Sequence, residues 1–521
     1  MKKISKIRWN RYKESHQGQD AIALFNQLAA PECTPEEMIQ AAKKYDPQLF
    51  YNISEKECES LREVIDFYLH GMKEVIQKEK IDFKTTDDCL DFYVGVLYAT
   101  TQHSDDMSFE DIPTGAFKRS VADNIFISLA LYNAIGKFFI PNFFVMQFIY
   151  LKKFAEKYEI DLPDTPKKAD YKERCLFYYD ICDCFNEFKQ ENEFESWAEF
   201  CAFLYDLELP EIKEELENED ESTMPSVPQQ AWLLVGNYGE GERDMKLGFW
   251  QANELTEKGD LLLFYEKSPV MAMNSIWISQ THGVVDPFFA RYSNTYIGQK
   301  IDIPAEYALT IKDFKASEYF QNKGSKGNFV SKNFQDCSGW PVSNDDFKEI
   351  LRMLEAKGFD TSKIPHLYEP EKIGDVDIKV EQDVSDLRLV PMLEQMGWKE
   401  GVDFKPEMQF QAGRGTTGAD INKRVDFALH YIDREDKKSA RVVIECKLYM
   451  KNGNEINDAF KQGESYAKWG NARVMVLCDK AQIRVYKRNK DGEFSSSKYI
   501  KFTWADTENA DKFNELKRLL S

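Results

Sequence analysis

The stretch from Arg424 to Trp469 constrains the fold of this chain more than any other. It reads RVDFALHYI, then ARVVIECKLYM, then NDAFKQGESYAKW. Alternating apolar residues and a β-branched run predict two strands, and the third segment has the spacing of an amphipathic helix. Successive side chains of a strand point to opposite faces, so Glu445 and Lys447 share one face of the second strand.

Asp426 lies on the first of these strands, 19 positions before Glu445. If the strands are neighbours, the two carboxylates and the ammonium of Lys447 converge. Hard oxygen ligands of this kind hold Mg²⁺ or Mn²⁺. A bound Mg²⁺ polarises a phosphate oxygen and lowers the pKa of a water molecule, while a lysine orients that water or offsets negative charge. The three residues therefore predict metal-dependent hydrolysis of a phosphodiester.

The segment resembles the PD-(D/E)xK nuclease superfamily, most closely the nuclease domains of type I restriction enzymes and RecB-like nucleases. Asp426, Glu445 and Lys447 match the catalytic motif residue by residue. Gln462 and Tyr466 match the Gln-x-x-x-Tyr element that follows the lysine in those groups. Their i, i+4 spacing puts both on one helix face. The resemblance implies that all five residues serve catalysis.

The same family places an acidic helix before the first strand. Residues 381–396 read EQDVSDLRLVPMLEQM, and either Glu381 or Asp386 would face the metal. Pro391 departs from an uninterrupted helix, because proline lacks a backbone N–H.

The resemblance also implies the metal ligands and the fold of this region. The metal would be bound by Asp426, by Glu445 and by the backbone carbonyl of Cys446. The surrounding residues 375–521 would form an αβββαβ restriction-endonuclease-like core. The alternative is that these are ordinary surface charges on an α/β domain, because Glu-x-Lys triplets are common in strands.

The N-terminal part of the chain has a different character. Residues 1–210 show apolar residues at helical spacing and predict an all-α domain. Residues 211–230 are rich in acids, Pro and Ser, which predicts a solvated linker. The apolar segment 125–151 contains Lys137 and a Pro-Asn pair, so two buried helices meeting near Pro141 are expected instead of a membrane span.

Residues 231–360 predict a third region, in which AWLLVGN, LLLFYEK and SIWIS read as strands and 248–253 as helical. This region resembles an EVE domain, a PUA-like β-barrel whose relatives bind modified bases in DNA or RNA. A base taken out of its stack needs an aromatic cage and hydrogen-bonding groups. The candidates for such a cage are Trp250, Asn253, Asn274, Ser275, Trp277, Tyr292 and Trp340. Tryptophans in a small barrel are more often core than cage.

Composition limits the remaining function classes. Ten scattered cysteines without a Cys-x-x-Cys pair and only six histidines argue against a zinc site or a disulfide scaffold, and favour free thiols in a reducing cytoplasm. The net charge of −21 is unexpected for a protein that touches nucleic acid. From Gly401 onward, however, 23 Lys and Arg outnumber 18 Asp and Glu.

Together these features predict a multidomain α+β protein with an N-terminal all-α domain, a central PUA-like β-barrel and a C-terminal nuclease core. The expected function is a Mg²⁺-dependent endonuclease of a modification-dependent restriction or anti-phage defence system. Its partner would be DNA carrying a modified base, and cutting of both strands would suggest a homodimer. The alternatives are a nuclease that acts on RNA, such as tRNA, and a non-catalytic nucleic-acid-binding protein with a decayed nuclease.

Overall fold

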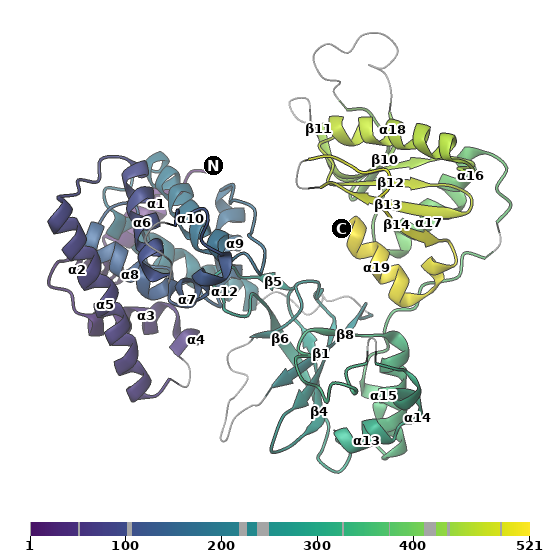
Figure 1. Ribbon diagram of the computed structural model, residues 1–521, viewed down its shortest axis with the longest axis horizontal. Helices are drawn as coiled ribbons and strands as arrows, with labels where there is room; N and C mark the ends of the chain where they lie inside the picture. The colour runs from purple at the N-terminus through teal and green to yellow at the C-terminus, as the bar shows by residue number, and fades with distance from the viewer. Residues whose placement is uncertain are drawn as a thin grey trace, which may run out of the picture. The chain divides into compact units, whose positions relative to one another are not determined.

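The computed structural model describes residues 2–50, 53–101, 107–217, 227–236, 249–325, 328–374, 376–410, 424–434, 438–489 and 492–521. The chain is a mixed α/β protein with N-terminal helices and two mixed sheets (Figure 1). It divides into two compact units. The first comprises Met1–Ser226, Trp232–Pro304 and Thr310–Trp340, and the second comprises Val227–Ala231, Ala305–Leu309 and Pro341–Ser521.

The N-terminal part is helical, as the sequence predicts. Many of its helices begin at a Ser or Thr whose side chain accepts a hydrogen bond from the first turn, which is what the unpaired N–H groups there require. The helices are α1 (Lys6–Lys13), α2 (His16–Ala29), α3 (Pro35–Tyr45), α4 (Pro47–Phe50), α5 (Glu55–Glu79), α6 (Thr86–Thr100), α7 (Lys118–Ala122), α8 (Asn124–Ile135), α9 (Phe148–Tyr158), α10 (Tyr171–Glu191), α11 (Trp197–Ala202) and α12 (Leu209–Glu217).

The expected linker begins later than the sequence suggests. A π-helical turn, η2 (Phe203–Glu208), joins α11 to α12 without a break, so helix continues to Glu217. The acidic run that favours a solvated linker is thus partly helical. The other part of that prediction, residues 218–226, lies outside the described residues.

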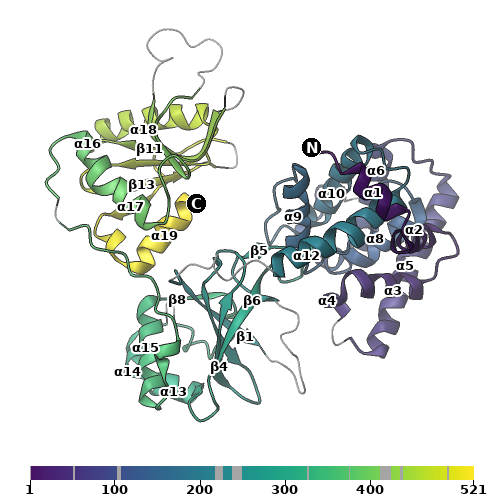
Figure 2. The same cartoon turned by 180° about the vertical axis from the view of Figure 1, so that it is seen from behind.

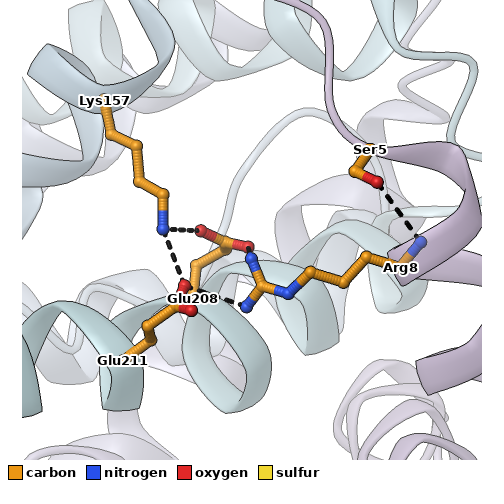
Figure 3. Close-up of polar contacts among 5 residues, drawn as sticks. All are labelled: Ser5, Arg8, Lys157, Glu208 and Glu211. Carbon is orange, nitrogen blue, oxygen red and sulfur yellow. Dashed lines mark hydrogen bonds and ion pairs between the residues drawn. The ribbon is translucent and has the colours of Figure 1, made fainter.

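A buried carboxylate explains why helix persists here. The side chain of Glu208 is only 1% exposed, and it binds Arg8 of α1 at 2.7 Å and Lys157 of α9 at 2.9 Å. Glu211 on α12 forms ion pairs with the same two residues, Arg8 and Lys157 (Figure 3). Removing either cation would leave the buried carboxylate of Glu208 with a single partner and would destabilise the cluster. The cluster therefore fixes α12 against α1 and α9.

The apolar segment 125–151 forms two separate buried helices, α8 and the first turn of α9. Asn142 lies between them and is hydrogen-bonded within the protein. Its backbone N–H donates to the Ser128 hydroxyl, and its side-chain amide donates to Asn124 Oδ1. No helix among the described residues is both long enough and apolar enough to cross a membrane.

The first sheet is mainly antiparallel, and its strand order is β2-β6-β4-β3-β1-β8, with β5 paired to β6 and β7 paired to β4. The strands are β1 (Ala231–Gly236), β2 (Phe249–Gln251), β3 (Leu261–Glu266), β4 (Ala272–Ser279), β5 (Val284–Val285), β6 (Ser293–Asp302), β7 (Leu309–Thr310) and β8 (Trp340–Val342).

The helical prediction for 248–253 is wrong, because Phe249–Gln251 is strand β2. Pairing with β6 overrides the local pattern there. The two ends of the strand path approach each other beyond β2 and before β8. Asn253 Nδ2 donates to the carbonyl of Gly339 at 2.9 Å. A Cβ at Gly339 would lie 3.1 Å from the backbone N of Asn253.

The N-terminal helices and most of the first sheet belong to one compact unit. Arg174 of α10 is 1% exposed and donates to the carbonyls of Pro287 and Phe289, which lie between β5 and β6. Asp286 accepts the backbone N–H of Met146, and Phe288 lies in the core of the helical part. The division into separate regions at 210 and 231 therefore understates how firmly the two are joined.

The second sheet has the order β14-β13-β12-β11-β10-β9, with one parallel pair, β11 and β12. Its strands are β9 (Phe404–Met408), β10 (Val425–Asp433), β11 (Lys438–Cys446), β12 (Val474–Cys478), β13 (Gln482–Lys487) and β14 (Ile500–Thr503). Its helices are α16 (Glu381–Val384), the π-helical turn η6 (Ser385–Leu389), α17 (Val390–Gln395), α18 (Gly453–Trp469) and α19 (Ala510–Leu520). Helix α13 (Ile311–Ala316), α14 (Glu318–Asn322) and α15 (Asn344–Ala356) precede this part.

Helices cover both faces of the second sheet (Figures 1 and 2). One face packs against α17 and α19 through a core that includes Ile444 and Cys446. The other face packs against α18 through Val443 and Leu477. Alternation along β11 therefore directs Glu445 to the α18 face.

Candidate functional site

Three of the residues singled out from the sequence meet at one end of the second sheet. Phe427 pairs with Ile444, so Asp426 and Glu445 are adjacent on neighbouring strands. The backbone N–H of Cys446 donates to Asp426 Oδ2 at 2.6 Å. Lys447 Nζ lies 2.7 Å from Glu445 Oε1. The antiparallel pairing of β10 with β11 thus assembles two carboxylates and an ammonium.

Of these three residues, Glu445 has the least ordinary environment. Its side chain is only 2% exposed, and its Oε2 has no hydrogen-bond partner among the described residues. Burial and the neighbouring Asp426 raise the pKa of Glu445 to about 7, against the attraction of Lys447. A buried oxygen without a donor is costly, and native proteins keep few of them.

The charges of Asp426 and Lys447 are tuned by the same cluster. Burial raises the pKa of Asp426, and the nearby Glu381 and Glu407 add to the effect. Burial by itself would lower the pKa of Lys447, but the carboxylates of Glu445, Glu381 and Asp426 outweigh it and raise that pKa. The site therefore favours the charged form of Lys447 and makes the charged forms of the two buried carboxylates less favourable than in water.

Of the two acids proposed from the preceding helix, the structure brings only Glu381 to this cluster. Glu381 Oε1 lies 3.5 Å from Lys447 Nζ. Asp386, on η6, accepts from Gln382 at 2.8 Å and is exposed. The helix contains a π-helical turn immediately before Pro391, the position at which the backbone lacks an N–H.

Helix α18 contributes the Gln-x-x-x-Tyr pair, and Gln462 Nε2 lies 3.4 Å from Tyr466 Oη. Tyr466 is 3% exposed and packs in the core between α18 and the sheet, whereas Gln462 is partly exposed. Between them lies Gly463, which sequence reasoning overlooked. A Cβ at Gly463 would lie 2.8 Å from Met475 Sδ, so this glycine lets α18 approach β12.

A second residue that sequence reasoning overlooked is Glu407, on β9 next to β10. It is exposed, lies 3.1 Å from Arg424, and helps to raise the pKa of Asp426. The only sequence signal was the short strand pattern of Phe404–Met408, which has one conspicuous Pro and no apolar run.

The residues at the site fit a hard divalent cation. Among the described residues, no group of three or more His, Cys, Asp or Glu side chains is already gathered around one point. Mg²⁺, however, is usually bound through one or two carboxylates, with water and substrate phosphates completing the shell. Asp426 and the unpartnered Oε2 of Glu445 supply two such carboxylates. The backbone of Cys446 also contacts the site, because its N–H donates a hydrogen bond to Asp426 Oδ2.

The residues proposed as a base cage in the first sheet are placed differently. Trp277 is 6% exposed and belongs to the sheet's hydrophobic core, and its indole N–H donates to the buried Ser275 at 3.1 Å. Trp250 packs against the same core, with its ring 5.1 Å from that of Phe264. A Cβ at Gly236 would lie 2.3 Å from the Trp250 ring. These three candidates are packing residues.

The remaining four candidates also contact neighbouring residues. Asn253 binds Gly339, and Asn274 donates to Glu266 at 2.6 Å. Tyr292 is 7% exposed, and its hydroxyl donates to the carbonyl of Pro166 in the helical part. Trp340 is partly exposed, with Lys332 Nζ 4.8 Å from its ring centre. The structure does not bring the seven residues together around one pocket.

All ten cysteines lie in the described part of the chain and are free thiols. Cys446 and Cys478 are register partners on β11 and β12, with their sulfur atoms 3.4 Å apart. They lie on the face opposite α18, behind the carboxylates.

No protein-family model, no curated protein and no solved structure matches this chain.

Proposed function

We propose that the chain is a Mg²⁺-dependent nuclease of the PD-(D/E)xK type, with its active site on the α18 face of the second sheet. One observation carries the proposal: the carboxylates of Asp426 and Glu445 and the ammonium of Lys447 converge, while Glu445 Oε2 is buried without a partner. Titratable groups with strongly shifted pKa values and unsatisfied atoms are concentrated at functional sites.

The chain's own residues supply distinct parts of the chemistry. A bound Mg²⁺ would polarise the scissile phosphate and acidify a water molecule. Asp426 and Glu445 would hold that ion in their charged forms and release their protons to water, because a nearby cation favours the charged carboxylate. Lys447 would orient the attacking water or offset charge on the phosphate. Glu381, paired with Lys447, would position that ammonium.

The proposed substrate is nucleic acid, with DNA that carries a modified base as the first choice. Support for a base-reading surface in the first sheet is limited to Trp340, which is partly exposed with a lysine over its ring. Stacking of a base on an exposed aromatic ring contributes ~1–3 kcal/mol. A reader that uses Trp340 would therefore affect substrate choice more than the rate of cleavage.

The direct test is incubation of the full chain with DNA and RNA, in the presence of Mg²⁺ or EDTA. The DNA would be unmodified, methylated, hydroxymethylated or glucosylated, and the RNA would include tRNA. We expect cleavage that requires Mg²⁺ and disappears in Glu445→Gln. Binding without cleavage on every substrate would instead favour a nucleic-acid-binding protein with a decayed nuclease.

A further inference from the structure

A second candidate site lies in the helical part, far along the sequence from the carboxylate cluster. It is an open apolar groove between α5 and α6, with a volume of about 540 Å³. We call it the α5–α6 groove. Its lining residues are Phe67, Tyr68, Gly71, Met72, Val75, Ile81, Asp88, Asp91, Phe92, Gly95, Val96, Ala99 and Thr100.

Two glycines in this lining have no explanation within the chain. Gly71 and Gly95 lie inside α5 and α6, where glycine is less favourable than alanine. A Cβ at either position would meet no atom within 4 Å. At Gly463, in contrast, a Cβ would lie 2.8 Å from Met475 Sδ, so close packing within the chain explains that glycine.

The groove also leaves large apolar side chains in contact with water. Phe67 is 70% exposed and Val75 is 46% exposed, and both lie on the α5 wall. Contiguous exposed apolar surface of this kind marks an interaction site more often than isolated exposed residues do. The exposed apolar side chains and the two glycines have a common explanation. An apolar ligand would approach the backbones of α5 and α6 closely at Gly71 and Gly95.

The shape of the groove favours a helix as its occupant. The α6 wall runs from Asp88 to Thr100, roughly 18 Å at the rise of an α-helix. Along both walls the lining residues recur at helical spacing, which forms ridges that a third helix can pack between. Helix-in-groove recognition uses apolar anchors at i, i+3 or i+4, and i+7.

The charge around the groove selects the partner further. Asp88 and Asp91 line it on the α6 side. No Lys or Arg stands among the lining residues of this described part of the chain. A partner with Lys or Arg beside its apolar stripe would be attracted, and an acidic partner would be repelled.

We propose that the α5–α6 groove binds an amphipathic α-helix of a partner protein, with apolar anchors in the groove and basic residues facing Asp88 and Asp91. The two glycines allow the anchors to approach the backbones of α5 and α6. The inference is independent of the nuclease proposal, since it concerns other residues and a different kind of ligand.

The test uses the full chain and three labelled peptides of about 16 residues, long enough to span the groove. One is a helix with a Leu stripe flanked by Lys, one has the same stripe flanked by Glu, and one is a scrambled form of the Lys peptide. Fluorescence anisotropy measures binding. We expect the Lys helix to bind, and the Glu helix and the scrambled peptide to bind roughly tenfold more weakly or worse.

The decisive variants are Gly71→Ala and Gly95→Ala. Each should raise the melting temperature by a few degrees, because alanine is the better helix former and the space is open. Each should nevertheless weaken binding of the Lys helix by roughly tenfold, because the new methyl fills the approach. Asp91→Asn should weaken it less, and only at low salt. Gly453→Ala, which also meets no atom within 4 Å but lies on α18, is the matched control and should leave binding unchanged.

Three outcomes would overturn the proposal. Equal binding of the scrambled peptide would show that net charge alone attracts the probe. Unchanged binding to both glycine variants would place the peptide elsewhere. If the Lys helix does not bind, and a small uncharged apolar molecule binds in a way that depends on Gly95, the groove is a small-molecule pocket.

Discussion

Buried polar side chains in the two sheets differ at the positions considered as candidate sites. In the first sheet, a buried polar group is held by a neighbour: Trp232 donates to Asp260 at 2.7 Å, and Trp277 donates to Ser275. In the second sheet, Glu445 is equally buried, yet one of its oxygens has no partner among the described residues. Satisfied groups specify packing, whereas an unsatisfied buried atom needs a specific explanation, and a bound cation is the one proposed for Glu445.

This contrast separates packing residues from candidate site residues. A base cage needs aromatic and amide side chains, which made residues of the first sheet candidates. Trp277, Asn253 and Tyr292, however, already have hydrogen-bond partners within the protein. In the second sheet, the spacing of Asp426 and Glu445 along the sequence predicts a shared site, and the fold brings both side chains to one end of the sheet. Mutations can test whether the contrast is real.

The largest effect is expected at the carboxylate cluster. Asp426→Ala, Glu445→Ala and Lys447→Ala should each lower Mg²⁺-dependent cleavage by roughly 10²–10³-fold or more, because metal binding and water activation are separate requirements. Cleavage rates under single-turnover conditions measure this, and circular dichroism checks that each variant is folded. Full activity in Glu445→Ala would show that the second sheet holds no catalytic site.

In the first sheet, Trp277→Ala should reduce stability instead of changing substrate choice. Emptying a core position that is 6% exposed costs roughly 3–5 kcal/mol for a tryptophan. Urea unfolding measures the loss. A Trp277→Ala variant of normal stability that no longer prefers modified DNA would place this ring on a pocket wall and erase the contrast between the sheets.

The pH dependence of stability sharpens the comparison. Because the folded protein raises the pKa of Glu445 from 4.5 to about 7, the native state holds this proton more tightly than the unfolded chain does. The contribution of Glu445 to stability is therefore greatest below pH 4.5 and falls as the pH rises through 7, by at most about 3 kcal/mol.

Urea unfolding at pH 5 and pH 8 checks this, with Glu445→Gln as the comparison. The variant should lose much of the pH dependence, since its amide does not titrate. Mg²⁺ should raise the melting temperature of the wild type more at pH 8 than at pH 6, because the ion binds the charged carboxylate. A Mg²⁺ effect that is the same at both pH values in the wild type would count against Glu445 as a ligand.

On α18, Gln462 and Tyr466 should separate function from packing. Gln462 is partly exposed, so Gln462→Ala should keep the stability within roughly 0.5 kcal/mol while lowering cleavage about tenfold. Tyr466→Ala should lower the melting temperature, because this ring is 3% exposed in the core. Wild-type cleavage by Gln462→Ala would reduce α18 to a packing helix.

The smallest effect is expected at Asp386. Asp386→Asn should leave cleavage unchanged within about twofold, because its contact is with Gln382. Glu381→Gln should lower cleavage severalfold through the loss of its pairing with Lys447. The reverse result would mean that the helix turns a different face to the site when substrate binds.

Local sequence was sufficient for several features of the candidate site. The alternation of β11 predicts that Glu445 and Lys447 share a face, and the structure has Lys447 Nζ 2.7 Å from Glu445. The helical periodicity of α18 predicts that Gln462 and Tyr466 are neighbours, and they are 3.4 Å apart. Strand and helix periods are properties of the chain itself, so residues a few positions apart have a fixed relation.

Only the tertiary structure decided what depends on residues distant in sequence. Glu381 and Asp386 look equivalent along the chain, and the approach of α16 to β11 distinguishes them. Trp277 looks like a cage residue until strand pairing buries it in a core. Segment 249–251 follows its partner β6 instead of its own pattern. Burial, register and the satisfaction of hydrogen bonds are set by which segments meet, and that information is spread over the whole chain.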